Sequence, residues 1–517
     1  MNAIQFIPAL LSAIFLFSVL LAGCGSGSDT TDTHTPPATD NPVDPPPELS
    51  GDTPLAPHND DLTNIATAPP AADERVNIEL TDAYQSQVTD LELTEAGFWC
   101  HVQRQVDEHT VRLYTTLDWQ PGWNQRLQCH IDAQLAFQYQ PAEGTVIVDT
   151  AMLDSSHVIM LEAVLRESTQ PNAIGSWFEL RLSTLNTTGQ PVHQRWLEDI
   201  PRPEELFFYT HIAGDEAPTR RTEESLSHNG KPQLTANSLA RLRVHQGTPY
   251  LLIHSYGVKV YRLYQDLTVA WSRQVMPAYT WLWAESLANE SDMAIREDGT
   301  VAVGFELHDQ DVAIYNSHFD EKLQDNNQGY DVGIAILSPT GALENTFIAG
   351  LQGHRENLGK LFWRADELLL TGSTRYTKEG AAGGTTEWDG YIARIDPTTG
   401  TTLHSQLLHV HDEDAMRDAL LTDTGRLLIA GESGYRQADT NSQTSYGYGV
   451  IYEVTDKGEV QPIIKLDTAR NSAITGLRVA GDTLYYRYDF DGFITHTCDH
   501  DTTQCWLKSG ISNLALD

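Results

Sequence analysis

The sequence feature that most restricts the fold is a pattern repeated along the C-terminal half of the chain. DVGIAILSPTG from Asp331, DGYIARIDPTTG from Asp389 and GYGVIYEVTDKG from Gly447 recur about 58 residues apart. Each copy alternates apolar and polar residues up to a Pro/Gly or Lys-Gly turn, and further strands such as ALLTDTGRLLIAGES follow. Four short antiparallel strands per repeat are typical of a propeller blade, whereas a solenoid of βα units would need helical periodicity that the sequence lacks.

Extending the repeat outward predicts six complete blades and two half-blades at the chain ends. The complete blades are expected at about 125–166, 176–255, 256–306, 330–373, 389–432 and 447–488. The leftover N-terminal pair GFWCHVQRQVDEHTVRLYTTL and C-terminal hairpin GFITHTCDHDTTQCWLKS would join into one composite blade, which closes the ring and removes exposed strand edges. The sequence therefore predicts an all-β fold, a closed β-propeller with seven four-stranded antiparallel blades, with eight blades as the alternative.

These repeats resemble the delta-60 and SBBP-type propeller repeats from about Tyr256 to Tyr488. In those families a blade reads as an aspartate, an alternating strand, a Pro-x-Gly turn and a D-G-x-x-x-V-x-G strand, as in MAIREDGTVAVGFE. The piece ARIDPTTG also resembles PQQ-type blades, but most copies here lack the tryptophan that docks those blades. The PQQ-type propellers therefore rank second.

The N-terminus carries an apolar run over residues 3–22 that has no charged side chain and is long enough to span a bilayer. At its end, Leu21-Ala22-Gly23-Cys24 resembles the lipobox of bacterial lipoproteins, although the first six residues lack the positive charge usual in signal peptides. The resemblance implies a signal peptide over 1–23, acylation of Cys24 with palmitate among its chains, and a lipid anchor without a spanning helix. Because Gly25 is not the aspartate of an inner-membrane retention signal, the outer membrane is favoured, with its periplasmic and outer sides both left open.

Residues 24–75 are rich in Pro, Thr and Asp and predict a disordered tether, so the propeller domain is expected over 76–517. The four remaining cysteines predict two disulfides in an exported chain, with free buried thiols as the alternative. Cys498 and Cys505 would staple the C-terminal hairpin, and Cys100 and Cys129 would tie the closing blade to the first one.

The charge balance restricts the partners. A net charge of -38 and an isoelectric point near 4.7 repel phosphate backbones and anionic lipids, so nucleic acid is excluded and membrane contact is expected through the lipid anchor only. The acidity is typical of a protein kept soluble in salty surroundings. A basic partner or bound cations are the alternatives.

The lengths of the connections predict which face of the propeller binds. Turns such as SPTG and TDKG are short and share one face, because strands in a blade alternate in direction. Nearly every long insertion falls on the opposite face, at 199–237, 277–290, 307–329, 375–388 and 434–446. Long loops on one rigid face are where a scaffold usually carries its function.

Two groups in these loops are candidate metal ligands. The residues of the first are His409, His411, Asp412 and Asp414 in HVHDED, and those of the second are Asp325, Asn327 and Asp331. Imidazole suits zinc, and alternating carboxylate and amide oxygens suit calcium, although the second group lacks the distal glutamate of a complete calcium loop. A solvated acidic loop is the alternative for both groups.

Aromatic side chains form another candidate ligand-binding set, namely Tyr279, Trp281, Trp283, Trp388 and Tyr446. They could form a stacking platform for a glycan, or they could pack between blades as a half-buried strand would. Local catalytic signatures such as G-x-S-x-G and H-E-x-x-H do not occur in the sequence. The sequence therefore favours a non-enzymatic lipoprotein that binds a protein or glycan partner through its long-loop face, over a glycan-directed hydrolase or lyase and over an outer-membrane assembly scaffold.

Overall fold

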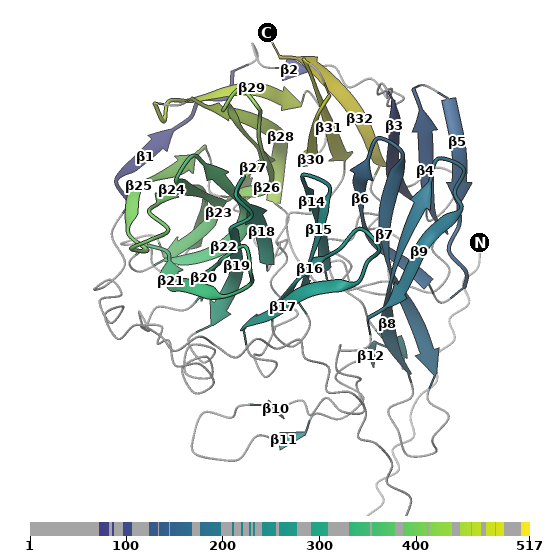
Figure 1. The fold of residues 1–517 in the computed structure, drawn as a ribbon. Helices are drawn as coiled ribbons and strands as arrows, with labels where there is room; N and C mark the ends of the chain where they lie inside the picture. The colour runs from purple at the N-terminus through teal and green to yellow at the C-terminus, as the bar shows by residue number, and fades with distance from the viewer. Residues whose placement is uncertain are drawn as a thin grey trace, which may run out of the picture. The chain divides into compact units, whose positions relative to one another are not determined.

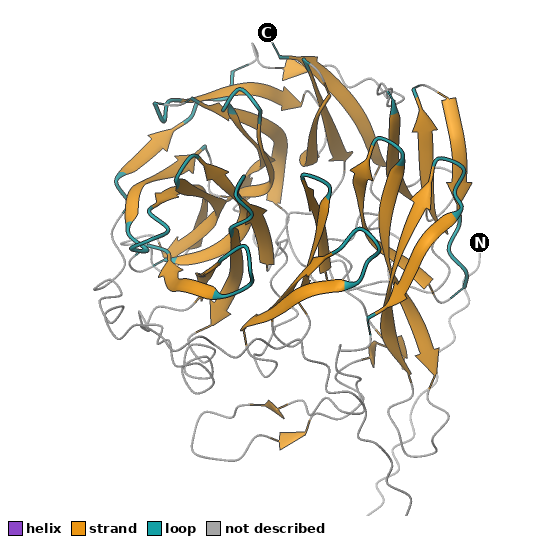
Figure 2. Ribbon diagram, viewed as in Figure 1, coloured by secondary structure: helices purple, strands orange, loops and turns teal. Residues whose placement is uncertain are grey.

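A computed structural model of the chain describes the propeller domain and a short segment before it. The described residues are 72–81, 85–86, 97–105, 124–132, 134–143, 145–167, 176–197, 209–210, 219–220, 227–228, 231–232, 240–254, 258–276, 291–308, 330–351, 354–377, 386–410, 413–436, 445–455, 457–466, 472–480, 482–490 and 508–516. All of them belong to one compact unit, Ser50–Asp517. Figure 2 shows strands and connections throughout these residues, and none of their segments is a helix that could cross a membrane.

Seven antiparallel sheets follow one another along the chain (Figure 1). Blade 1 is β3 (Phe98–Gln105), β4 (Asn124–Ile131) and β5 (Gln134–Tyr139), and blade 2 is β6 (Thr145–Asp154), β7 (His157–Glu167), β8 (Ser176–Asn186) and β9 (Pro191–Trp196). Blade 3 is β14 (Ala240–His245), β15 (Thr248–His254), β16 (Val258–Leu263) and β17 (Val269–Met276), and blade 4 is β18 (Ser291–Ile295), β19 (Val301–His308), β20 (Tyr330–Leu337) and β21 (Leu343–Ala349).

Blades 5 and 6 are also four-stranded, and one parallel bridge between Trp388 and Glu413 joins them. Blade 5 is β22 (Arg355–Arg364), β23 (Glu367–Thr377), β24 (Thr386–Ile395) and β25 (Thr402–His409), and blade 6 is β26 (Glu413–Leu421), β27 (Leu427–Arg436), β28 (Ser445–Val454) and β29 (Val460–Leu466). Blade 7 is β30 (Ser472–Ala480), β31 (Thr483–Phe490) and β32 (Lys508–Ala515). Two-residue strands pair between blades 2 and 3 in the chain, β10 (Tyr209–Thr210) with β11 (Thr219–Arg220) and β12 (Ser227–His228) with β13 (Lys231–Pro232).

The prediction of an all-β propeller with seven blades is confirmed, but the blade boundaries differ by two strands. The repeat that begins at Asp331 starts with the third strand of blade 4, not with the first strand of a blade. The terminal strands also lie in separate sheets, because β3 pairs with β4 in blade 1 and β32 pairs with β31 in blade 7. The expected composite closing blade is thereby replaced by two blades with three described strands each.

The first strands of neighbouring blades pack against one another, as β6 does with β14, β18 with β22 and β26 with β30. Figure 1 shows β32 of blade 7 beside β3 of blade 1, and the charge of Arg478 on β30 lowers the pKa of His101 on β3. The core lies between neighbouring blades. For example, Leu251 and Tyr261 of blade 3 share one buried cluster with Leu161 and Leu182 of blade 2. Each sheet packs against a neighbouring blade on both of its sides. Both sides are therefore buried, which explains the near-continuous apolar runs such as VAVGF in β19.

Three aspartates on the innermost strands of alternate blades connect each of them to the following blade. Their carboxylates accept backbone N–H groups across the blade interface, from Leu242 to Asp149 (2.7 Å), from Leu361 to Asp292 (3.0 Å) and from Leu477 to Asp418 (2.8 Å). A β-bulge lies at Asp149 in blade 2 and at Asp418 in blade 6, and another lies just before Leu361 in blade 5 and just before Leu477 in blade 7. A bulge interrupts the regular strand pairing, so the carboxylates and N–H groups next to it can bond to the neighbouring blade.

Basic side chains balance these aspartates at the centre of the ring. Arg243 Nη2 lies 2.9 Å from Asp292 Oδ1, and Lys360 Nζ lies 3.5 Å from Asp418 Oδ1. Burial would raise the pKa of Asp292, but Arg243, Lys360 and Arg241 lower it below its usual value. We call Asp149, Arg241, Arg243, Asp292, Lys360 and Asp418 the inner-strand network. The network contains three acids and three bases, and its ion pairs and hydrogen bonds join neighbouring blades.

The two faces of the ring differ in their connections. One face, here called the hairpin face, carries short turns between first and second strands and between third and fourth strands, such as 246–247, 296–300 and 422–426. Glycines with positive φ close several of these turns, including Gly299 and Gly425. At the opposite face, here called the loop face, lie the strand ends that flank the segments 277–290, 309–329, 378–385 and 437–444, as the sequence predicts.

The N-terminal segment adds a strand to the outer edge of two blades. The strand β1 (Glu74–Asn77) pairs in parallel with β25, and β2 (Gln85–Ser86) pairs in parallel with β29. Glu74 and Arg75, which the sequence assigns to the tether, are thus paired with β25 of blade 5. Asp73 accepts the backbone N–H of Ser405 at 2.8 Å, and Gln406 donates to Glu74 at 3.1 Å.

Candidate functional site

Three ionisable side chains meet at the loop face between blades 5 and 6. Asp389 lies near the start of β24, His409 ends β25, and Asp414 lies near the start of β26. Their ligand atoms all lie within 4.8 Å of one another, and His409 Nδ1 is 2.8 Å from Asp389 Oδ1 and 3.8 Å from Asp414 Oδ2. We call this group the Asp–His cluster. It has the mixture of carboxylate and imidazole that can hold a divalent metal ion.

The two carboxylates of the cluster are rigidly held. Both side chains are fully buried, with exposed fractions of 0%, whereas His409 is 22% exposed. Asp414 accepts the hydroxyl of Ser433 at 2.6 Å and the backbone N–H of Val410 at 2.7 Å. These bonds fix Asp414 against its own blade and against the connection between blades 5 and 6.

An internal cation already contacts this cluster. Arg75, on β1, places Nε 3.0 Å from Asp389 Oδ2, and its Nη2 is 3.0 Å from His409 Nδ1. A guanidinium next to a buried carboxylate supplies the charge that a metal ion would otherwise supply. The Asp–His cluster is therefore neutralised in part by the N-terminal segment of the same chain.

A second pair of acids lies at the preceding blade interface, between blades 4 and 5. Asp331 near the start of β20 and Glu356 near the start of β22 occupy the positions that Asp389 and Asp414 occupy one repeat later. Their exposed fractions are 4% and 0%. We call this group the carboxyl pair. Burial and the nearby charge of Asp331 raise the pKa of Glu356 well above its usual value.

The surroundings of the two groups correspond only in part. The Thr374 hydroxyl donates to Glu356 Oε1 at 2.9 Å, as Ser433 does to Asp414. The strand ladders place Gly350 where the next repeat has His409. A side chain at Gly350 would start 2.6 Å from Asp331 Oδ1 and 2.8 Å from Glu356 Oε2, so the two oxygens fill the space next to this glycine.

The structure brings together only some of the predicted metal ligands. His409 and Asp414 do lie together. Asp389 lies with them, although the sequence analysis identifies Asp389 only as the first residue of a repeat. Asp331 lies on a buried strand, and its acidic neighbour is Glu356. The other predicted ligands lie outside the described residues, namely His411, Asp412, Asp325 and Asn327. The zinc and calcium loops therefore stay predictions.

Besides Asp389, two residues of these sites were missed from the sequence. Arg75 falls in the segment assigned to the tether, although ERVNIEL alternates polar and apolar residues as an edge strand does. Glu356 has no motif of its own. It could have been found by aligning RENLGKLF with EDAMRDALL, since both segments begin a blade and contain a bulge at the same place.

The aromatic platform is described only at Trp388 and in part at Tyr446. Trp388 is half-buried at the loop end of β24, and the Arg375 guanidinium lies 5.7 Å from its ring centre. The backbone of Tyr446 pairs with Tyr435 in the ladder between β27 and β28. Tyr279, Trp281 and Trp283 lie outside the described residues, so the glycan platform stays a prediction.

One of the two predicted disulfides is present. Cys100 and Cys129 form a disulfide and face each other directly across β3 and β4. The bridge therefore staples two strands of blade 1, whereas we had expected it to tie two different blades. Cys498, Cys505 and the predicted lipidation site Cys24 lie outside the described residues.

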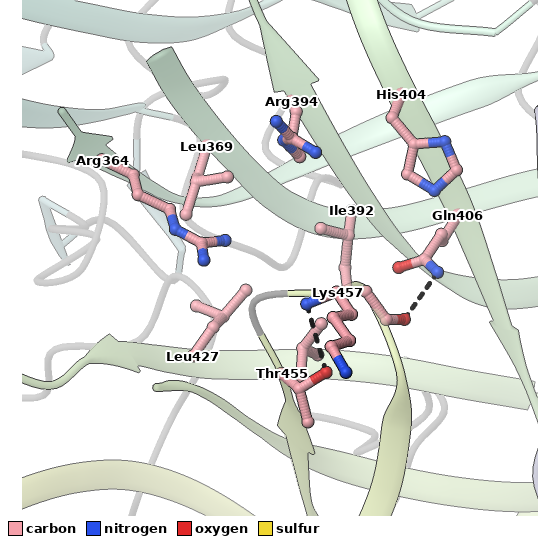
Figure 3. A pocket seen from close by; sticks show the side chains of 11 residues that line it. Arg364, Leu369, Ile392, Arg394, His404, Gln406, Leu427, Thr455 and Lys457 are labelled. Atoms are coloured by element: carbon pink, nitrogen blue, oxygen red, sulfur yellow. Dashed lines mark hydrogen bonds between the residues drawn. The ribbon is translucent and has the colours of Figure 1, made fainter. Parts of the chain in front are cut away.

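A small cavity opens at the hairpin face, between blades 5 and 6 (Figure 3). Its lining includes Arg364, Arg394, His404, Gln406 and Lys457. The volume is about 30 Å³, which holds about one water molecule. Arg394 is also engaged, since it forms two 2.8 Å bonds to Glu367. This cavity is too small to bind an extended substrate.

Comparisons with known proteins find only distant structural similarities. No protein-family model matches the sequence, and no curated protein sequence matches it significantly. Solved structures similar to it include a europium-containing methanol dehydrogenase, at 10% identity and a TM-score of 0.35 over 74% of this chain and 73% of that one. An ulvan lyase shares 10% identity at a TM-score of 0.37, covering 66% of this chain and 79% of its own. An alpha-L-arabinofuranosidase from Fusarium graminearum shares 8% identity at a TM-score of 0.32, covering 71% and 92%.

These likenesses are distant, so the class of protein is defined by the sheets and blade contacts described above. The chain is a seven-bladed β-propeller with a cluster of buried acids on its loop side. Its activity has to be argued from its own residues.

Proposed function

We propose that this protein is a lipid-anchored protein of the bacterial outer membrane whose propeller binds a macromolecular partner through the loop face. The observation that carries the proposal is the unequal distribution of connections between the two faces. Tight turns close the hairpin face, whereas the strands that flank 277–290, 309–329, 378–385 and 437–444 end and begin at the other face. Long connections on a rigid scaffold are where binding residues usually lie.

Burial at the loop face favours a macromolecule over a small substrate. The side chains of Asp331, Glu356, Asp389 and Asp414 are 0–4% exposed, so they stiffen the base of the face instead of reaching solvent. A glycan-directed hydrolase or lyase would need carboxylates that its substrate can reach. The net charge of -38 further favours a partner with a basic surface.

The membrane anchor rests on the sequence. The apolar run 3–22 ends in Leu-Ala-Gly-Cys at residues 21–24, and acyl chains on Cys24 would hold the protein at the membrane without a spanning segment. An outer-membrane assembly scaffold would be one form of this proposal, with a protein of that machinery as the partner.

Lysine crosslinking on intact cells, followed by mass spectrometry, tests the proposal. Lys322 and Lys378 belong to connections of the loop face, and Lys457 belongs to a turn of the hairpin face. We expect links to a partner at Lys322 and Lys378 and none at Lys457, with the protein in the outer-membrane fraction. A Cys24→Ser variant should leave that fraction. Partner links at Lys457 alone, or the absence of any partner, would contradict the proposal.

A further inference from the structure

The carboxyl pair differs from the Asp–His cluster in how its charge is balanced. In the Asp–His cluster, Arg75 and His409 both contact Asp389. At the corresponding place beside the carboxyl pair the chain has Gly350, which brings no side chain. Within the described part of the chain, Glu356 Oε2 receives no hydrogen bond, although Glu356 is 0% exposed. A buried carboxylate oxygen without a donor is costly unless something else binds it.

A buried hydroxyl lies near the same place. Tyr391, on β24, is 0% exposed, and its hydroxyl has no hydrogen-bond partner among the described residues. Tyr391 belongs to one buried cluster with Val332, Ala349 and Leu358, at the blade interface that holds the carboxyl pair. Burial, together with the charges of Glu356 and Asp331, raises the pKa of Tyr391 well above its usual value. The hydroxyl of Thr374 and the backbone N–H of Leu351 also contact the Glu356 carboxyl group.

We propose that Asp331 and Glu356, with the hydroxyls of Tyr391 and Thr374, form a buried binding site for a hard cation such as Ca²⁺ between blades 4 and 5. Every group in this set offers oxygen and none offers nitrogen or sulfur. Oxygen ligands select calcium over zinc, and calcium takes about six to eight of them, so water would supply the remainder. The site goes beyond partner binding, because it would join the two blades below the loop face.

The repeat strengthens this inference. The same two positions hold acids in successive repeats, and in the later repeat a guanidinium and an imidazole lie against them. The earlier repeat keeps the acids but has glycine at the position of the imidazole. A bound cation would balance the negative charge of Asp331 and Glu356, as Arg75 and His409 balance that of Asp389. The competing explanation is one proton shared between the two carboxyl groups.

Calcium binding to the purified full chain tests the site. After treatment with a chelator, we expect titration calorimetry with calcium chloride to show one binding event, elemental analysis to find one calcium per chain, and calcium to raise the Tm. Glu356→Gln keeps the shape and the bond from Thr374 but removes the charge, so it should abolish this binding event. Asp331→Asn should also abolish the calcium binding event, and it serves as the second variant if Glu356→Gln folds poorly.

Glu162→Gln is the matched control, because Glu162 is also 0% exposed but is paired with Arg181 at 2.8 Å. This variant should bind calcium as the unmodified chain does. A chain without a calcium signal, or a Glu356→Gln variant that binds calcium unchanged, would overturn the proposal. If calcium has no effect and Glu356→Gln is as stable as the parent or more so, the pair shares a proton and the cation site is refuted.

Discussion

Replacing Asp292 by asparagine tests whether the inner-strand network holds the ring together. Asp292 is 1% exposed, accepts the N–H of Leu361 from the next blade and contacts Arg243 at 2.9 Å. Asparagine keeps the shape, but its amide cannot balance the charge of Arg243. Removing one partner of a buried ion pair costs about 3–5 kcal/mol, and we expect the lower end because the Arg243 side chain is 34% exposed.

The expected shift in Tm follows from the size of the domain. Unfolding entropy of about 2.1 cal/mol/K per residue gives about 0.9 kcal/mol/K for a propeller of about 440 residues, so a loss of about 3 kcal/mol lowers the Tm by about 3 °C. Differential scanning calorimetry measures this shift and also shows whether the domain unfolds in a single transition.

Asp298→Asn in the same blade is the control. Asp298 forms a 2.7 Å ion pair with Arg296 but is 52% exposed, and surface pairs of this kind contribute about 0–1 kcal/mol. If Asp292→Asn lowers the Tm no more than Asp298→Asn does, the inner-strand network does not stabilise the ring and the reasoning is refuted.

Three further predictions concern single positions. Burial, together with His130 and Arg478, lowers the pKa of His101 to about 4 from its usual 6.5, so stability is full above pH 6.5 and is lost as the pH falls towards 4. At about pH 4.5 this loss is about 2.5 kcal/mol, and urea unfolding of His101→Gln should show a correspondingly smaller decrease between about pH 7 and about pH 4.5; an equal decrease would contradict it. Arg75→Met removes the contacts to Asp389 and His409, so hydrogen exchange at residues 74–77 should speed up while β26 and β27 stay protected; unchanged exchange would mean that Arg75 does not anchor β1. Gly350→Ala places a methyl group 2.6 Å from Asp331 Oδ1, so denaturant unfolding should show a loss of about 1–3 kcal/mol, and a neutral effect would show that the carboxyl pair is not packed as described.

The sequence predicted the strands and the number of blades well, because the alternating pattern and the turn residues are local signals. It could not predict where a blade begins. The segment from DVGIAILSPTG to LFWRADELLLTGST contains the same two hairpins whether a blade is taken to begin at its first or at its third strand. Only the strand pairing and packing show that β20 is the third strand of blade 4. The composite closing blade was a consequence of that two-strand offset.

The candidate site was predictable where its residues are close in sequence. His409 and Asp414 lie in one short segment, HVHDED, and the structure keeps them together. Asp389 and Arg75 join them only through strand pairing, since β24 pairs with β25 and β1 adds to the outer edge of β25. Contacts across more than 300 residues, such as Arg75 with Asp389, leave no local pattern.

The central claim, that the loop face binds a macromolecular partner, is tested most directly by site-specific photocrosslinking in living cells. A photoreactive amino acid would replace Tyr279 or Tyr446 on the side of the long connections, and Thr399 or Asp423 in turns of the hairpin face. We expect a discrete crosslinked product of higher mass from positions 279 and 446 and none from positions 399 and 423. Products from the hairpin face alone, or equal products from both faces, would contradict the account.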